Sequence, residues 1–347
     1  MNTRFESSNS KIREGLPMNI LITGGTGFIG KQIARKILEL GTITLDGQTA
    51  QSVEKIILFD AFAGEDIPED PKIQVVIGDI TDKEQVSKIT KNVDVIWHLA
   101  AVVSSAAEAD FDLGMEVNLY GLLTLLESVR QHGSKPRFIF ASGCAVFGGA
   151  LPEVVTDDTV VTPKSSYGMQ KAVGELLVSD YSRKGFIDGR VLRLPTIVVR
   201  PGKPNKAAST FFSSIIREPL KGETAVCPVQ ADTPVFITSP RRCVDSMIHA
   251  AVISPDRLSD QRIIPLPGLT VTVQQMLAAL EKVAGKSAVD LVQWQEDKTI
   301  QRIVQSWPVQ VKAEYAESLG FKADKNFESI IQAHIEDTQE LIAEIAN

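Results

Sequence analysis

The chain has 347 residues, 44% of them hydrophobic, and a formal net charge of −7 at pH 7. This length allows one large α/β domain with an appended part, or two domains that share a cleft. The acidic balance without a lysine- or arginine-rich tract excludes nucleic acid as an expected partner, and no apolar stretch approaches the roughly 18 residues that span a bilayer, so no membrane partner is expected.

The first 17 residues are polar and mixed in charge, and they lack the continuous apolar core of a signal peptide. We expect residues 1–17 to form a flexible N-terminal extension, with the folded part beginning at Met18. The three cysteines, Cys144, Cys227 and Cys243, are widely spaced and form no CxxC pair. This pattern suits a reducing compartment, so the sequence predicts a cytoplasmic protein whose cysteines are small buried side chains.

Short apolar runs alternate with amphipathic stretches between residues 19 and 194. The runs are typical of strands buried on both faces, and the stretches have helical periodicity. The expected strands cover residues 19–23, 55–59, 73–77, 93–98, 137–141 and 190–194, and the expected helices cover 28–40, 83–90, 113–132 and 166–184. Repeated strand–helix units predict an α/β protein with a Rossmann-type, doubly wound parallel sheet over residues 18–195.

The composition changes after Pro195, where prolines become frequent and the expected strands are short, as at residues 235–238. Helical patterns return at residues 242–252, 273–284, 299–305 and 327–345. We interpret residues 196–347 as a smaller C-terminal α/β lobe, which closes over the first domain and supplies the substrate contacts.

A glycine-rich turn lies directly between the first expected strand and the first expected helix, where residues 23–30 read TGGTGFIG. Its three spaced glycines allow a tight turn, a close approach of backbone N–H groups to a pyrophosphate and close packing of the helix on the sheet. Outside this context the glycines would indicate only a loop, but here they predict a dinucleotide site. The residues expected at the cofactor are Gly24, Thr26, Gly27, Phe28, Ile29 and Gly30.

A carboxylate, Asp60, ends the second expected strand. It would accept hydrogen bonds from the ribose hydroxyls and repel a 2′-phosphate, so NAD is favoured over NADP. The gap from the glycine turn is longer than usual, which we attribute to a surface insertion at residues 41–53. The alternative is a solvated aspartate at a strand end. Asp79 and Ile80, after the third strand, are expected to flank the adenine.

Tyr167 and Lys171 are four residues apart in an expected helix, so their side chains leave the same face about one turn apart. The ammonium of Lys171 would favour the phenolate form of Tyr167, which could then act as a base for a substrate hydroxyl. The spacing alone indicates little, and the alternative for Tyr167 is a packed aromatic side chain. The glycine turn favours the catalytic interpretation.

Together these motifs resemble the extended short-chain dehydrogenase/reductase family, which also contains the sugar-nucleotide epimerases and dehydratases. The resemblance is carried by TGGTGFIG at 23–30, Asp79, His-Leu-Ala-Ala at 98–101, Asn118, Tyr167 with Lys171, and Arg193. It implies that the helix with Tyr167 and Lys171 faces the nicotinamide, that Lys171 holds a ribose hydroxyl, and that helices 113–132 and 166–184 form a homodimer bundle. The further cofactor contacts that it implies are Leu99, Ala100, Ala101 and Pro195.

The second half is similar to those members of the family that oxidise four-carbon sugar acids with NAD. The similarity runs through residues 193–205, 211–212, 216–220, 239–241, 266–272 and 319–321. It implies oxidation of the C2 hydroxyl of a small sugar acid, D-erythronate, to 2-dehydro-D-erythronate, with Tyr167 as the base. Thr196 replaces an asparagine that is usual in the epimerases, and residues 199–201 replace their Gly-Pro turn, which counts against a nucleotide sugar.

A free acid needs a cation, and the planar guanidinium of arginine suits a carboxylate. The candidate cations are Arg200, Lys203, Arg217 and Arg241, each of which has the alternative of a structural or surface charge. Thr196 would reach the substrate from the end of the sixth strand.

The usual catalytic hydroxyl of the family lies five residues before the glycine of its Val-Tyr-Gly element, where this chain has Gly143. Ser142 is the nearest hydroxyl, and we predict that it holds the reacting oxygen, although its side chain would then have to depart from strict strand alternation. Asn118 is expected to stabilise the helix that carries Tyr167 and Lys171, or a water behind Lys171.

Two other functions stay open from the sequence. An epimerase or dehydratase with retained NAD would use the same cofactor site without net formation of NADH. A non-catalytic NAD-binding sensor would account for Gly143. His98 is better interpreted as part of the fourth strand's turn than as a base, and no His, Cys and Asp residues have metal-ligand spacing, so no metal is predicted.

Overall fold

The computed structural model describes residues 17–45, 49–202, 208–258 and 260–346. Residues 1–16, nearly all of the expected N-terminal extension, lie outside the described residues, as does the candidate cation Lys203. No helix within the described ranges is long and apolar enough to cross a membrane.

One large sheet forms the centre of the molecule, with the strand order β11-β7-β6-β5-β1-β3 and with β2 and β4 both paired to β3. Every pair in this sheet except β2 with β3 is parallel. After β1, the chain adds β3 and β4 on one side of it and then β5, β6 and β7 on the other side. The direction in which strands are added to the sheet therefore reverses between β1 and β5. The parallel strands are β1 (Met18–Thr23), β3 (Ala50–Asp60), β4 (Ile73–Ile77), β5 (Val95–His98), β6 (Arg137–Gly143), β7 (Asp188–Leu194) and β11 (Ile263–Pro265).

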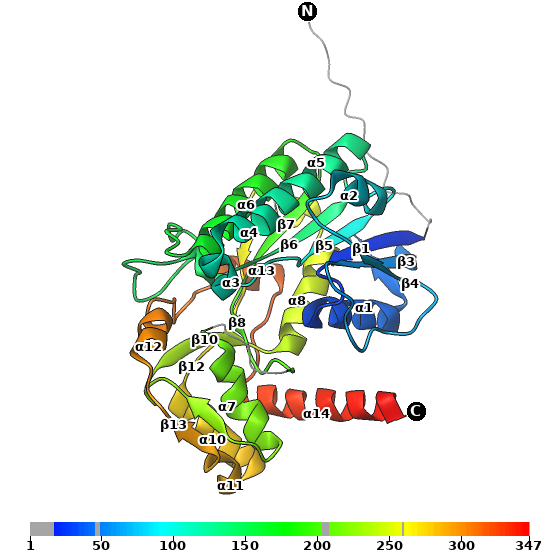
Figure 1. Cartoon of the computed structure of the whole chain (residues 1–347). Coiled ribbons are helices and arrows are strands. Elements are labelled where there is room, and N and C mark those ends of the chain that lie inside the picture. Colours follow the sequence, from blue (N-terminus) through cyan, green and yellow to red (C-terminus); the bar gives the residue numbers. More distant parts are fainter. Residues whose placement is uncertain (1–16, 46–48, 203–207, 259, 347) are drawn as a thin grey trace, which may run out of the picture.

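Helices cover both faces of this sheet (Figure 1). Ile20 and Ile22 of β1 pack into a core with α1 and α8, whereas Leu21 faces the opposite core with α2, α5 and α6. Both faces are apolar because both are covered. The predicted Rossmann-type doubly wound sheet is confirmed. The covering helices are α1 (Phe28–Leu40), α8 (Pro240–Val252), α2 (Lys83–Ile89), α5 (Leu122–His132) and α6 (Ser166–Arg183).

Within the expected surface insertion at residues 41–53, of which 46–48 lie outside the described residues, most described residues are in strands. A short strand, β2 (Thr42–Thr44), pairs antiparallel with the first residues of β3, which begins at Ala50. Ile43 and Val53 are buried in the α1 side of the core. The burial of these side chains explains why the segment folds onto the sheet edge instead of forming a loop.

The expected helix at residues 113–132 is interrupted. A short helix, α3 (Ser104–Ala109), precedes α4 (Phe111–Gly114), a π-helical turn η1 (Met115–Gly121) and then α5. Asn118 lies in the π-helical turn and is buried. Single π-helical turns occur often at functional sites, because they redirect one side chain without ending the helix.

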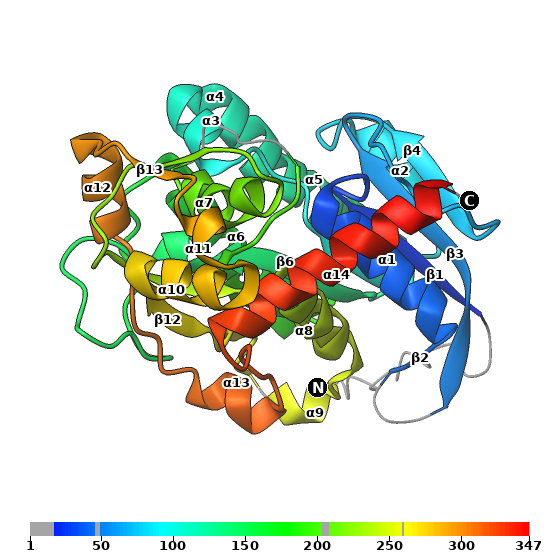
Figure 2. The same ribbon diagram turned by 90° about the horizontal axis from the view of Figure 1, so that it is seen from below.

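Much of the second half forms a lobe with its own core at the carboxyl edge of the large sheet, below that sheet in Figure 1 (Figure 1, Figure 2). One small sheet has the order β12-β10-β8, and a second pairs β13 with β9. The lobe strands are β8 (Thr196–Ile197), β9 (Ala225–Cys227), β10 (Pro234–Thr238), β12 (Leu269–Thr272) and β13 (Val292–Trp294). The lobe helices are α7 (Thr210–Leu220), α10 (Val273–Ala284), α11 (Lys286–Val289), α12 (Lys298–Gln305) and α14 (Phe327–Ala346).

The chain passes between the two parts more than once. It leaves the large sheet after Leu194 and enters the lobe at Thr196. It then returns: α8, β11 and α13 (Glu314–Leu319), with the short α9 (Pro255–Leu258), belong to the first part. Met247 of α8 and Phe321 pack in the same core as α1.

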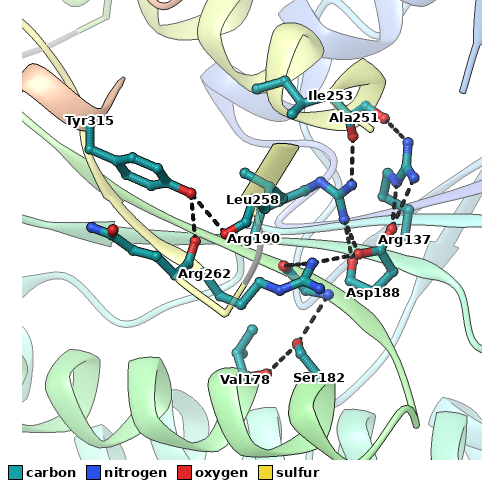
Figure 3. A network of polar contacts seen from close by, with 12 residues as sticks. Arg137, Val178, Ser182, Asp188, Arg190, Ala251, Ile253, Leu258, Arg262 and Tyr315 are labelled. Carbon is teal, nitrogen blue, oxygen red and sulfur yellow. Dashed lines mark hydrogen bonds and ion pairs between the residues drawn. The ribbon is translucent and has the colours of Figure 1, made fainter. Parts of the chain in front are cut away.

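A buried polar network lies at the amino ends of β6 and β7, at the edge opposite to the glycine turn (Figure 3). The Asp188 carboxylate accepts from Arg137 at 2.9 Å, Arg190 at 2.6 Å and Arg262 at 2.8 Å. Arg137 and Arg190 also donate to backbone carbonyls at the C-terminal end of α8. These cations satisfy carbonyls that the helix leaves unpaired and oppose its negative dipole end, so the network has a structural role.

Candidate active site

The glycine turn connects β1 to α1 where the direction of the sheet reverses. Gly24 has a φ of +68°, and a Cβ there would lie 2.8 Å from the backbone nitrogen of Ala100. A Cβ on Gly30 would lie 2.5 Å from the Gly24 oxygen. Since Cβ atoms essentially never approach other heavy atoms so closely, both positions require glycine. The turn is packed as a dinucleotide-binding turn needs to be.

The amino end of α1 is available to an anion. Gly27 occupies the N-cap position and has no side chain to cap the helix, and the first turn contains no acidic residue. The first N–H groups of a helix have no partner within the helix, and they lie at the positive end of its dipole. Phe28 and Ile29 contribute to this first turn, so the residues present fit the pyrophosphate of a dinucleotide.

Asp60 lies beside the glycine turn at the carboxyl end of β3. Its side chain accepts hydrogen bonds from the backbone nitrogens of Thr26 at 3.1 Å and Ala61 at 2.8 Å. Each carboxylate oxygen can accept a further hydrogen bond. The long sequence gap therefore does not separate Asp60 from the glycine turn, and its position suits a ribose.

Asp79 and Ile80 lie between β4 and α2. The Asp79 carboxylate accepts from both the backbone nitrogen and the hydroxyl of Thr81 at 2.8 Å. Ile80 is buried, and its side chain packs close to Gly121 of η1. The pair thus holds the turn at the carboxyl end of β4 in a fixed shape.

The turn after β5, Leu99 to Ala101, is fastened to the glycine turn. Thr23 Oγ1 lies 2.7 Å from His98 Nδ1 and accepts from the Ala100 nitrogen at 3.4 Å. Burial, followed by the charge of Lys171, lowers the pKa of His98 to about 3, so this imidazole is neutral. Its Nε2 has no hydrogen-bond partner among the described residues.

Tyr167 and Lys171 are brought together at the start of α6, as the helical spacing predicted. The hydroxyl of Ser165 caps the helix by accepting from the Gly168 nitrogen at 3.1 Å. Lys171 is buried, and its Nζ donates to the Ala141 carbonyl at 2.8 Å. The same Nζ lies 5.6 Å from the centre of the half-buried Tyr167 ring.

The electrostatic state of this pair is set mainly by burial. Burial raises the pKa of Tyr167 to about 12. Burial also lowers the pKa of Lys171 to about 8, while the Glu175 carboxylate opposes this change. Both effects have the same cause, because low dielectric surroundings disfavour the charged form of each group. Near neutral pH the phenol is therefore protonated and Lys171 is mostly charged.

Ser142 and Gly143 differ in what surrounds them. The Ser142 hydroxyl is buried and donates to Glu175 at 2.6 Å. Gly143 has extended backbone, and a Cβ there would meet only the Leu194 oxygen, at 3.6 Å, within 4 Å in the described structure. The position of the family's usual hydroxyl is thus open, and the neighbouring serine is engaged by a carboxylate.

Asn118 holds the turn after β5 to α6. Its side chain accepts from the Val102 nitrogen at 2.7 Å, and its amide nitrogen donates to the Val102 oxygen and, at 2.8 Å, to the side-chain oxygen of Gln170. Sequence reasoning missed Gln170, which is fully buried beside Lys171. Its place directly before Lys171 in the predicted helix was the available signal.

The candidate substrate cations differ in their partners. Arg217 pairs with Glu218 at 2.6 Å and donates to the backbone oxygen of Arg200. Arg241 pairs with two carboxylates of α14 at 2.7 Å each. The Arg200 guanidinium donates to the Ser209 hydroxyl at 3.4 Å, and burial followed by the charge of Arg217 lowers its pKa. Arg200 is thus the least committed of the three.

Pro195 and Thr196 lie where the chain passes from the large sheet to the lobe. Pro195 is buried, and Thr196 pairs with Ile237 of β10. Gly143 is paired with Leu194 in the neighbouring strand, so Thr196 begins close to the open space at Gly143. In the described residues, no three His, Cys, Asp or Glu side chains gather in a group that could hold a metal ion.

Comparison with known proteins defines the class. Residues 20–235 match the family model of the NAD dependent epimerase/dehydratase family. The chain belongs to this family, which confirms the resemblance predicted from its motifs, and its cofactor is of the NAD type.

Three similar proteins indicate which kind of enzyme within this family the chain resembles. The chain is 50% identical over 321 residues to a D-erythronate dehydrogenase of Cupriavidus necator, covering 92% of this chain and 98% of that protein. It is 45% identical over 320 residues to a D-erythronate dehydrogenase of Haemophilus influenzae, covering 92% and 99%. A crystal structure described as a nucleoside-diphosphate-sugar epimerase from Agrobacterium tumefaciens has a TM-score of 0.87 and 42% identity, covering 93% and 94%. The chain is thus an oxidoreductase of the dehydrogenase kind.

Proposed function

We propose that this protein oxidises the C2 hydroxyl of D-erythronate to 2-dehydro-D-erythronate with NAD. The observation that carries the proposal is the similarity to D-erythronate dehydrogenases over nearly their whole length. The buried Lys171 beneath Tyr167, beside a turn that fits a dinucleotide, supports a hydride transfer assisted by a tyrosine base.

The glycine turn and the amino end of α1 hold the pyrophosphate of NAD in this proposal, and Asp60 binds the adenosine ribose. The carboxylate of Asp60 would repel the 2′-phosphate of NADP, so NAD is the preferred form. The remaining proposed cofactor contacts are Asp79, Ile80, Leu99, Ala100, Ala101, Pro195, Tyr167 and Lys171. Bound there, NAD would supply the acceptor for the hydride that leaves C2 of the substrate.

Tyr167 removes the hydroxyl proton of the substrate. Because its pKa is about 12 in the protein alone, with Lys171 already beside it, the phenol needs further positive charge before it can act near neutral pH. The cationic ring of bound NAD would add to the charge of Lys171, which holds a ribose hydroxyl, and Asn118 fixes the helix behind the pair. Ser142 assists the reaction from the end of β6, where its hydroxyl donates to Glu175 of the same helix.

The carboxylate of the substrate is bound by the lobe that the chain enters at Thr196. Arg200 is the proposed principal cation, since Arg217 and Arg241 are already paired with carboxylates. Arg217 fixes the backbone of Arg200 through its hydrogen bond, and Thr196 contacts the substrate near C2.

We also propose that two copies associate through the helical face of η1, α5 and α6. Large apolar side chains are exposed there, with Tyr120 at 52% and Leu176 at 68% exposure. A dimer would cover them. Light scattering gives the mass directly, and Leu176→Arg is expected to convert a dimer to monomers. A monomeric unsubstituted protein contradicts this proposal.

The buried free thiols of Cys227 and Cys243 support a cytoplasmic location.

The test of function is formation of NADH, followed by absorbance, when purified protein is mixed with NAD and D-erythronate. We expect steady formation that Tyr167→Phe abolishes while NAD binding, measured by calorimetry, is retained. An epimerase, which the name of the Agrobacterium structure favours as the second candidate, would give no net NADH. Binding without any turnover would instead indicate a sensor.

A further inference from the structure

A buried carboxylate lies behind the candidate catalytic pair. Glu175 of α6 is 1% exposed, Ser142 of β6 is 3% exposed and Arg193 of β7 is 5% exposed. Arg193 grips the carboxylate with both ends of its guanidinium, at 2.9 Å and 2.7 Å, and Ser142 donates to it at 2.6 Å. Three elements of the nucleotide-binding part therefore meet at one side chain.

The position of this carboxylate along α6 is the important feature. Tyr167, Lys171 and Glu175 are spaced by four residues, so they form one stripe along the face that packs on the sheet. A buried charge is costly unless it is paired and fully hydrogen-bonded, and here Arg193 and Ser142 meet that need.

The other titratable groups around Lys171 and Glu175 are either uncharged near neutral pH or, in the case of Arg193, already paired. His98 on β5 is neutral, since its pKa is about 3. Burial raises the pKa of Cys144, at the end of β6, to about 12, so it stays a thiol. Arg193 is occupied by Glu175 itself. The Glu175 carboxylate is the negative charge that acts on Lys171, and it raises the pKa that burial lowers.

We propose that Glu175 is a positioning residue for the proposed reaction: held by Arg193 and Ser142, its carboxylate keeps Lys171 charged, and Lys171 in turn allows Tyr167 to lose its proton. Ser142 then acts through Glu175 and does not touch the substrate. The inference rests on the proposed function, because it assigns a purpose to the Tyr167 and Lys171 pair.

The direct measurement is the ionisation of Tyr167 in the NAD-bound protein, followed by ultraviolet absorbance of tyrosinate with Tyr167→Phe as the blank. With Glu175→Gln, Lys171 loses its proton at lower pH, so the phenolate loses its cation. We expect the ionisation midpoint of Tyr167, and the rising limb of the rate profile, to move up by about one pH unit. An unchanged midpoint in a folded variant would overturn the proposal.

Three further variants separate charge from structure. Glu175→Asp keeps the charge, so its midpoint for Tyr167 ionisation should lie close to that of the unsubstituted protein. Glu175→Gln combined with Arg193→Gln leaves no unpaired buried charge, so it extends the test if the single variant does not fold, and the same upward shift is expected. Asp180→Asn removes a charge from an exposed site on the same helix and should leave the midpoint in place.

Ser142→Ala decides between the two roles of this serine. If it only holds Glu175, which Arg193 still grips, turnover falls by about threefold or less. If it binds the reacting oxygen, turnover falls by about 10²–10³-fold at an unchanged midpoint, and the inference is wrong. Failure of D-erythronate as a substrate would not affect the tyrosinate measurement, so failure of the proposed function and failure of this inference are distinguishable.

Discussion

Lys171 donates a hydrogen bond from Nζ to the backbone carbonyl of Ala141 at 2.8 Å, so this side chain of α6 is fixed against the central sheet. We predict that Lys171→Met lowers kcat of the proposed oxidation by about 10²–10⁴-fold, because the phenolate of Tyr167 loses its cation. Steady-state formation of NADH checks this. Lys171→Arg is the control, since it keeps the charge but displaces it from the carbonyl. Wild-type kcat in Lys171→Met would contradict the role of Lys171.

Two glycines with nearly the same φ offer a matched test of the cofactor turn. Gly24 and Gly41 have φ values of +68° and +66°, but an added Cβ meets Ala100 at 2.8 Å only in the first case. Both alanine variants should lose about 1 kcal/mol of stability from the backbone conformation. Gly24→Ala should in addition weaken NAD binding by tenfold or more, roughly the effect of 1.4 kcal/mol. Calorimetric titration with NAD measures the difference, and equal affinities would exclude this turn as the cofactor site.

Asp60 is expected to control the choice between the two nicotinamide cofactors. Asp60→Ser removes both the ribose acceptor and the charge that repels a 2′-phosphate, so kcat/KM should fall with NAD and rise with NADP. Asp60→Asn keeps a hydrogen-bond acceptor and removes only the charge, which separates the two effects. The ratio of kcat/KM for the two cofactors is the measurement. A ratio that neither variant changes would mean that Asp60 does not contact the ribose.

The network at Asp188 predicts how stability depends on pH. Burial raises the pKa of this carboxyl, but Arg190 and Arg137 lower it by more, so the net pKa is below its ordinary value. The stabilisation is therefore complete above the ordinary pKa of about 3.9 and is lost as pH falls through the lower folded value. Urea unfolding between neutral and acid pH should show this loss.

Asp188→Asn should lower the free energy of unfolding at neutral pH by roughly 3–5 kcal/mol, because three arginines lose their shared counter-charge. The control is Asp180→Asn, which breaks the exposed pair with Arg183 and should cost less than about 1 kcal/mol. Similar values for the two variants would show that the buried network contributes no more than a surface pair.

Helices and strands could be predicted where the local sequence alone determines where the element begins and ends. The helix at residues 28–40 begins after the glycine turn and ends at Gly41, and its predicted limits are those of α1. The π-helical turn in the predicted helix 113–132 left no mark in the periodicity. It depends on hydrogen bonds of Asn118 with Val102 and Gln170, which are distant in sequence. The β2 hairpin depends in the same way on core contacts.

The residues of the candidate site could likewise be predicted only where a local motif carried them. Tyr167 with Lys171 and the glycine turn were visible because each motif is local. The direction of Ser142 was not, because it is set by Glu175, 33 residues later. A single glutamate in an amphipathic helix usually faces solvent, so the sequence alone did not mark Glu175 as part of the site. Its distance of four residues from Lys171 and eight from Tyr167 was the signal that could have found it.

The path of the chain between its two parts affects how the protein can be made. When a ribosome has released residues up to Leu194, it has produced the strands of the large sheet apart from β11, yet α8 is still missing from one face. Trp97 then lacks the Met247 carbonyl that accepts from its indole nitrogen at 3.0 Å. The nucleotide-binding half can complete its core only after the polypeptide has travelled through the lobe and come back, so synthesis order and folding order differ.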